Sequence, residues 1–369
     1  MIVPPDLEDA VHAAARDVVG EAALATGPLT RAIVDRSKRY TSERDRLSAR
    51  GEGDLAARAA FFTIADAMKI AIPIGELAGR GAIPPRRPLR VVDLGAGCGA
   101  LSLGLVATLE SDATGGPMFE LLLIDHDLDA LRIAGAALRD LSTRRGTTAS
   151  ITTRVADVTT THIPPADLVI AGTVLNELPE AERLPLVQRA LAALAPDGAL
   201  ILIEPALRDT SRALHVLRDA ALAAGAHVFA PCTRQGAPCP MLENPDDWCH
   251  EDRPVTLPPR TAELARLTHL RDSGLKFSYL VLRNQPLRLV ARDHAWRVVS
   301  EPLPAKGKLE LYGCSDAGRV PLRLLRRHRS DANRGFERAE RGDVVVTEAT
   351  EIGKDTSVER LTPAARKSD

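Results

Sequence analysis

Residues 91–100 read Val-Val-Asp-Leu-Gly-Ala-Gly-Cys-Gly-Ala, and this stretch decides the fold. An apolar run leads through Asp93 into three glycines at alternate positions, Gly95, Gly97 and Gly99, and a helical pattern follows. Glycine lets the backbone approach a ligand closely, and the first turn of a helix offers unpaired N–H groups. The stretch therefore predicts a strand, a ligand-binding turn and a helix.

Outward from this stretch, apolar runs alternate with helical stretches along the chain. Strands that read as continuous apolar runs between helices are typical of βαβ units, whose parallel sheet is covered on both faces. We therefore predict a doubly wound α/β fold with a mostly parallel sheet. The expected strands are 89–94, 120–124, 152–155, 168–171, 199–203, 227–230 and 276–283, and the expected helices include 127 onwards, 179–194 and 212–224.

The glycine pattern alone fits both a dinucleotide site and an S-adenosylmethionine site. An acid two residues before the first glycine, with glycines at every second position, resembles the first motif of class I S-adenosylmethionine-dependent methyltransferases. Asp125 ends the second expected strand, where a carboxylate can accept the ribose hydroxyls, and Asp157 follows the third, where such folds have an acid near the adenine. Asp157 is equally typical of a turn, and Asp127 is interpreted as a helix cap.

The fourth expected strand leads into a loop that contains Asn176 and Glu177. Methyltransferases that act on exocyclic amines often have Asn or Asp, two prolines and an aromatic residue here, whereas this chain has Asn-Glu-Leu-Pro. The two residues are candidates for catalysis, although Glu177 also suits a helix cap. Whether the chain is an enzyme is left open by this loop.

Four of the five cysteines lie late in the chain, at Cys232, Cys239, Cys249 and Cys314. Four thiolates suit either a tetrahedral zinc ion or an iron–sulfur cluster, and the spacing does not decide between them. The fifth, Cys98, lies in the glycine turn and is interpreted as a small apolar residue.

The composition sets limits on the class of protein. The 369 residues are 45% hydrophobic and 26% charged, with a net charge of −1, which fits a globular protein without a general attraction to nucleic acid. No apolar run is long enough to span a bilayer, and the start lacks a basic signal-peptide region, so we expect a cytoplasmic protein without a membrane partner. The expected parts are a helical segment (1–85), a ligand-binding domain (86–285) with a Cys-rich insertion (231–258), a small β module (286–350) and a disordered tail (351–369).

The expected β module carries a local excess of positive charge. Residues 286–341 contain 13 Lys or Arg and 7 Asp or Glu, a balance of +6. The densest group consists of Arg323, Arg326, Arg327 and Arg329. Such a group can neutralise RNA phosphates, and the alternative is a solvated basic face.

Several short motifs together resemble the methyltransferase-like family of the mitochondrial small ribosomal subunit and its bacterial relatives. They are residues 174–179 (Val-Leu-Asn-Glu-Leu-Pro), Ile203-Glu204-Pro205, Ala230-Pro231-Cys232, Cys239-Pro240, Trp248-Cys249-His250, residues 276–280 (Lys-Phe-Ser-Tyr-Leu) and Gly313-Cys314. The resemblance covers about residues 29–343, with Thr233, Arg234 and Glu251 departing from the family pattern.

The resemblance implies an S-adenosylmethionine-binding fold with a 4Fe-4S cluster on the four late cysteines, acting on the small ribosomal subunit and its rRNA. His250 would then be a neighbour of the cluster and not a ligand. Two alternatives stay open: a non-catalytic assembly factor that uses S-adenosylmethionine structurally, and a zinc-containing small-molecule methyltransferase.

Overall fold

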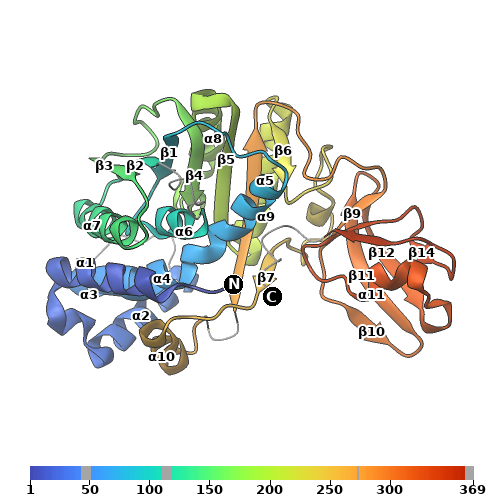
Figure 1. Cartoon of the computed structure of the whole chain (residues 1–369), viewed down its shortest axis with the longest axis horizontal. Coiled ribbons are helices and arrows are strands. Elements are labelled where there is room, and N and C mark those ends of the chain that lie inside the picture. Colours follow the sequence, from blue (N-terminus) through green and yellow to red (C-terminus); the bar gives the residue numbers. More distant parts are fainter. Residues whose placement is uncertain (43–50, 110–118, 272–273, 362–369) are drawn as a thin grey trace. The chain divides into compact units, whose positions relative to one another are not determined.

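A computed structural model of the chain describes residues 1–42, 51–109, 119–271 and 274–361 (Figure 1). The chain divides into two compact units, each built from segments that are far apart in the sequence. The first unit comprises residues 1–71, 84–198 and 253–275, and the second comprises 72–83, 199–252 and 276–369. The chain passes from the second unit back to the first between residues 83 and 84, close to the break expected near residue 85.

The first unit contains a helical layer built from the beginning of the chain. Its helices share one apolar core, in which Leu29, Ile33 and Phe61 are fully buried beside Leu264. Helix α7 of the same unit packs against α1. The elements of the layer are α1 (Pro5–Leu24), α2 (Thr26–Ser42), α3 (Gly51–Ala57), the π-helix η2 (Arg58–Thr63), α4 (Ile64–Asp66), the 3-10 helix η3 (Ala67–Ile70) and α10 (Pro259–Thr268).

Four parallel strands follow in the first unit, in the order β3-β2-β1-β4. The mainly apolar strands β1 and β4 are buried along almost their whole length, as expected for central strands covered on both faces. These strands and the helices after them confirm the predicted βαβ pattern. They are β1 (Leu89–Leu94), α6 (Ala100–Thr108), β2 (Phe119–Asp125), α7 (Leu128–Arg144), β3 (Ala149–Val155), β4 (Ala166–Gly172), the 3-10 turn η4 (Leu175–Glu177) and α8 (Glu180–Ala193).

The second unit contains strands in the order β5-β8-β6, and β7 also pairs with β8. Strand β8 runs antiparallel to both β5 and β6. Together with the order β3-β2-β1-β4, this is the strand pattern of class I S-adenosylmethionine-dependent methyltransferases, which confirms the predicted fold class. The elements are α5 (Ala71–Gly79), β5 (Leu194–Pro205, whose first five residues belong to the first unit), α9 (Arg208–Ala223), β6 (His227–Ala230), the 3-10 turn η5 (Pro240–Leu242), β7 (Glu251–Arg253) and β8 (Leu275–Arg283).

The last part of the second unit is a small β module with its own apolar core. Trp296, Leu311, Leu322 and Phe336 are buried at its centre. Its strands follow the order β14-β12-β11-β9-β13-β15, with β10 paired to β11. They are β9 (Ala295–Val298), β10 (Leu303–Ala305), β11 (Lys308–Ser315), β12 (Gly318–Leu325), β13 (Val344–Val346), β14 (Glu351–Ile352) and β15 (Glu359–Leu361), with η6 (Arg326–His328), η7 (Asp331–Asn333) and α11 (Arg334–Glu337) between them.

The expectation of a disordered tail from residue 351 is corrected for its first part. Strand β14 pairs with β12, and β15 pairs with β13, so both are held by the backbone of the module. Ile352 and Val358 add two buried side chains to the core of the module. Residues 362–369 lie outside the described residues.

In the part of the chain that the structure describes, no helix has the length and apolar character needed to cross a membrane.

Candidate functional site

The glycine turn lies in the first unit, between the end of β1 and the start of α6. Gly95, Gly97 and Gly99 all have positive φ, at 66°, 52° and 86°, a region that residues with a side chain adopt at a cost. A Cβ at Gly95 would lie 2.3 Å from the Val174 side chain, and one at Gly99 would lie 3.0 Å from the Ala134 side chain. Two of the glycines are therefore required for packing as well as for backbone shape.

Asp125, at the end of β2, fixes the turn from the neighbouring strand. Its Oδ2 accepts a hydrogen bond from the Gly97 N–H at 2.8 Å, and its Oδ1 accepts one from the Asp127 N–H at 2.9 Å. A carboxylate has about four acceptor positions, so two remain for a ligand hydroxyl. The carboxylate predicted for the ribose is thus placed against the glycine turn, as the sequence suggested.

Asp93 lies at the same turn but faces the protein interior. It is 2% exposed, and its Oδ2 accepts a hydrogen bond from the Ser102 hydroxyl at 2.6 Å. Burial raises the pKa of the Asp93 carboxyl to about 7, an effect that Asp125 reinforces and the Ser102 hydroxyl opposes. Asp93 therefore supports the start of α6 from within.

Asp157 lies two residues beyond β3, on an exposed turn. Its Oδ1 accepts hydrogen bonds from the Thr159 N–H at 2.8 Å and the Thr159 hydroxyl at 2.7 Å, and these bonds lower its pKa. This is an Asx turn, the arrangement that the sequence made equally typical of this position. Asp127 caps α7, accepting from the N–H groups of Asp129 and Ala130 at 3.1 Å each, which confirms the predicted helix cap.

Asn176 and Glu177 form the single 3-10 turn η4 after β4. Thr173, two residues before this turn begins, has a φ of 63°, which is strained backbone for a β-branched residue. Surrounding protein raises the pKa of the Glu177 carboxyl, and Arg36 and Arg58 act in the opposite direction. Both arginines come from the helical layer.

Arg58 is the residue at this turn that the sequence analysis missed. It begins the π-helix η2, and its guanidinium donates from Nη1 to Asp127 Oδ2 at 2.5 Å. Its Nη2 lies 3.6 Å from the position that a Cβ on Gly97 would take. In the sequence, Arg58 is the one charged residue among the small and apolar residues 56–62, which could have marked it as a candidate. Its position in a π-helix adds to this, because π-helical turns are frequent at functional sites.

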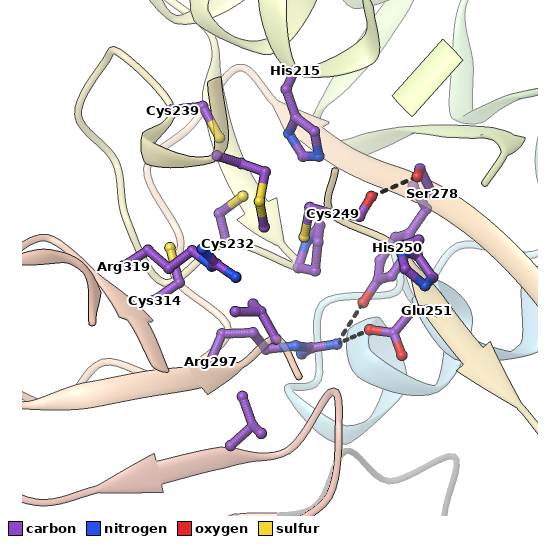
Figure 2. Close-up of a pocket in the computed structure, with 15 residues that line it drawn as sticks. His215, Cys232, Cys239, Cys249, His250, Glu251, Ser278, Arg297, Cys314 and Arg319 are labelled. Atoms are coloured by element: carbon purple, nitrogen blue, oxygen red, sulfur yellow. Dashed lines mark hydrogen bonds and ion pairs between the residues drawn. The ribbon is translucent and has the colours of Figure 1, made fainter. Parts of the chain in front are cut away.

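In the second unit, the four late cysteines line one cavity, as Figure 2 shows. Cys232 follows β6, Cys239 precedes η5, Cys249 precedes β7, and Cys314 lies on β11. The loop that carries three of them is tied to α9 by Arg212, whose guanidinium donates to four backbone carbonyls. These belong to Met241 (3.2 Å), Leu242 (3.1 Å), Asn244 (2.7 Å) and Asp247 (2.9 Å).

The thiols of this cavity are free. Burial raises the pKa of Cys239 to about 11 and that of Cys314 to about 12, and the neighbouring cysteines add to both shifts. Within the described ranges, no group of three or more His, Cys, Asp or Glu side chains is arranged to hold a metal ion. The structure thus brings the four predicted ligands to one cavity as thiols.

Two histidines also line the cavity. His215 is 2% exposed, and burial lowers its pKa to about 4. His250 stacks on Trp248, with ring centroids 5.7 Å apart and the planes 22° from parallel. Both imidazoles are therefore neutral at pH 7, since burial also lowers the pKa of His250.

A buried charged network borders the same cavity. Arg297 on β9 donates to Glu76 at 2.7 Å, to Glu251 at 2.8 Å and to the Tyr279 hydroxyl at 3.0 Å. The Tyr279 hydroxyl donates to Glu76 at 2.6 Å. Arg297 is also the cross-strand neighbour of Cys314. One guanidinium therefore joins α5, β7, β8 and β9 next to the cysteines.

The basic residues proposed for RNA differ in how far their charge is already neutralised. Arg323 is paired with Glu310 at 2.6 Å and Glu351 at 3.0 Å, and Arg329 is paired with Glu337. Arg326 and Arg327 are exposed on η6, and among the described residues neither has an acidic partner. Of the four arginines in this group, two therefore keep a charge that no acidic side chain among the described residues offsets.

No curated protein matches the chain. Solved structures that resemble it include TrmN from Thermus thermophilus (20% identity over 57% of this chain and 48% of that chain, TM-score 0.34). Another is the magnesium protoporphyrin IX methyltransferase ChlM from Synechocystis PCC 6803 (14% identity over 69% of this chain and 97% of that chain, TM-score 0.37). The chain thus spans about half the length of TrmN. The family model described as mitochondrial small ribosomal subunit Rsm22 matches residues 74–345, more than half of the chain, and the chain therefore belongs to this family.

Proposed function

We propose that the chain binds S-adenosylmethionine at the glycine turn of the first unit. The observation that carries this proposal is the joint geometry of Gly97 and Asp125, in which a positive-φ glycine turn is fixed by the carboxylate that ends β2. Such a turn leaves backbone open to a ligand, and a carboxylate at the end of the second strand suits ribose hydroxyls. Gly95 and Gly99 shape the turn, whereas Asp93 supports it from inside and Asp157 stands at an exposed turn nearby.

The partner that we propose is the small ribosomal subunit with its rRNA, because the family is described by that particle. The exposed arginines Arg326 and Arg327 offer charge for phosphate contacts. The test is sedimentation of the tagged chain in a sucrose gradient of cell extract. We expect it to travel with small subunits and to leave them as salt rises, and a chain that stays at the top of the gradient at low salt would contradict the proposal. The family description names mitochondria, and the cytoplasmic location expected from the sequence stays a prediction.

We also propose that Cys232, Cys239, Cys249 and Cys314 hold a 4Fe-4S cluster. The donor set fits, because four thiols from two distant parts of the sequence face one cavity, and four thiolates are the usual ligands of such a cluster. When bound, the cluster would cross-link the cysteine loop to β11 within the second unit. The high thiol pKa values belong to the metal-free state, since a coordinated thiol is deprotonated.

Anaerobic purification tests this assignment against zinc. The expected protein is brown and contains iron and acid-labile sulfide, both lost in Cys249→Ser. Cys98→Ser is the matched control, because Cys98 lies in the glycine turn of the first unit, and this variant should keep its iron. A colourless protein with one zinc per chain would overturn the cluster and favour the alternative of a zinc-containing enzyme.

Two readings of the glycine-turn site remain, an rRNA methyltransferase and a non-catalytic assembly factor that binds the same cofactor. The shape of η4 favours the second, because Asn176 and Glu177 are followed by Leu and Pro and not by the proline and aromatic clamp of amine methyltransferases. Transfer of labelled methyl groups to small subunits from a deletion strain distinguishes the two. Labelled rRNA that disappears with Asn176→Ala would show catalysis, and unlabelled rRNA with a bound chain would show an assembly factor.

A further inference from the structure

Arg58 brings a cation to the glycine turn from a part of the chain that lies before the methyltransferase motifs. Its side chain is 15% exposed, and its guanidinium lies over the turn, with Nη2 3.6 Å from the position of a Cβ on Gly97. The helix that carries it is fixed by the apolar core of the helical layer, where Phe61 and Ala57 are fully buried. The guanidinium is therefore held at this position by packing.

Most of the hydrogen-bonding capacity of Arg58 is unused. A guanidinium has five N–H donors, and among the described residues its acceptor is Asp127 alone. Asp127 in turn is committed to the first turn of α7 through its Oδ1, so only Oδ2 faces Arg58. The pair thus places a fixed cation beside the turn with donors left over for a further anion.

The acids near the turn do not offer that chemistry, and the other arginine is paired within the helical layer. Asp125 and Glu177 are acids, which accept hydrogen bonds and repel a second carboxylate. Arg36, the other arginine that affects Glu177, is bound to both oxygens of Asp54 at 3.0 and 2.9 Å. Arg58 is the described arginine whose guanidinium lies against Gly97.

We propose that Arg58 binds the carboxylate of the methionine part of S-adenosylmethionine and so makes the site selective for nucleosides that carry an amino acid. The inference rests on the proposed cofactor. That carboxylate is the ligand's negative group, and a guanidinium binds a carboxylate through short, charge-assisted hydrogen bonds. Asp127 then serves as the counter-ion that keeps Arg58 in place before the ligand arrives.

The test compares S-adenosylmethionine with decarboxylated S-adenosylmethionine by titration calorimetry, since the two ligands differ only in this group. The wild-type chain should bind the complete ligand about 10- to 100-fold more tightly, the worth of a charge-assisted hydrogen bond. Arg58→Gln should lose that preference. It should bind the complete ligand more weakly than the wild-type chain does, and its affinity for the decarboxylated ligand should stay within about threefold of the wild-type value. Arg58→Lys should keep part of the preference.

Arg132→Gln is the matched control, because it also removes an arginine paired with an acid at the start of α7, but on the exposed side. It should leave both affinities unchanged. A wild-type chain that binds the two ligands equally would overturn the role of Arg58 without any variant, while leaving the cofactor proposal standing. A fall in both affinities in Arg58→Gln would also overturn it, and a wild-type chain that binds neither ligand would remove the cofactor proposal and this inference together.

Discussion

The sharpest prediction on stability concerns Arg297, the centre of the buried network in the second unit. Its side chain is 3% exposed, and its three hydrogen bonds reach Glu76, Glu251 and the Tyr279 hydroxyl. Burial raises the pKa of Tyr279 well above its usual range, so the phenol stays protonated and donates to Glu76. The guanidinium therefore lies within hydrogen-bond reach of two buried carboxylates.

Arg297→Met keeps much of the side-chain volume and removes that charge. Removing one partner of a buried ion pair typically costs about 3–5 kcal/mol, because the remaining charge is left without compensation. Both carboxylates are affected here, so we expect a loss at the upper end of that range. Replacing a whole buried ionic group by uncharged side chains often changes the stability little. The triple variant Glu76→Gln, Arg297→Met, Glu251→Gln should therefore recover most of the loss.

Urea unfolding followed by tryptophan fluorescence measures this directly. Both tryptophans, Trp248 and Trp296, lie in the second unit, and Trp296 is buried next to Arg297 with its indole N–H bonded to the Thr347 carbonyl at 3.0 Å. A change below about 1 kcal/mol in Arg297→Met would refute the reasoning, since that is the range of an exposed salt bridge. A triple variant no more stable than the single one would refute it as well.

Two further outcomes follow from the site residues. Because the folded-state pKa of Asp93 is raised to about 7, the folded protein keeps a proton that the unfolded chain has already released, and stability should fall as pH rises from 4 to 7. In the wild-type chain this proton changes the free energy of unfolding by up to about 4 kcal/mol between pH 4 and pH 7, and Asp93→Asn should remove that change in thermal or urea unfolding. A variant with the pH profile of the wild type would contradict the conclusion that burial raises the pKa of Asp93. Removing Arg326, Arg327 and Arg329 together should weaken co-sedimentation with small subunits and lower the salt slope by about 2–3, whereas Arg323→Gln should change the slope little because two glutamates already neutralise Arg323. Equal co-sedimentation of the triple variant and the parent at every salt concentration would show a solvated basic face.

Local pattern was enough to predict the sheet and its glycine turn. The run from 89 to 94 is mainly apolar and is followed by glycines, and β1 has the same bounds, because a buried central strand and a positive-φ turn each leave a direct mark on the sequence. The helix cap at Asp127 was predictable for the same reason. The four cysteines were recognisable because four of the five in the chain fall in its later part, whereas free cysteines normally scatter through protein cores.

Contacts between residues that are far apart in the sequence could not be predicted. Arg58 meets Asp127 across 69 positions and Arg297 meets Glu76 across 221, and only the folded topology brings such pairs together. Asp93 belongs to the motif, but its side chain turns inward to Ser102, which no spacing rule indicates. The strands β14 and β15 were missed because they are two and three residues long and take their stability from pairing with β12 and β13.

The measurement that tests the central claim most directly is calorimetric titration of the anaerobically purified chain with S-adenosylmethionine, beside the variant Gly97→Leu. We predict saturable binding of one ligand per chain, and a loss of at least about tenfold in affinity in the variant, because a side chain on a positive-φ glycine strains the turn and blocks the approach of the ligand to its backbone. Unaltered binding in Gly97→Leu, or binding of NAD in place of S-adenosylmethionine, would contradict the account.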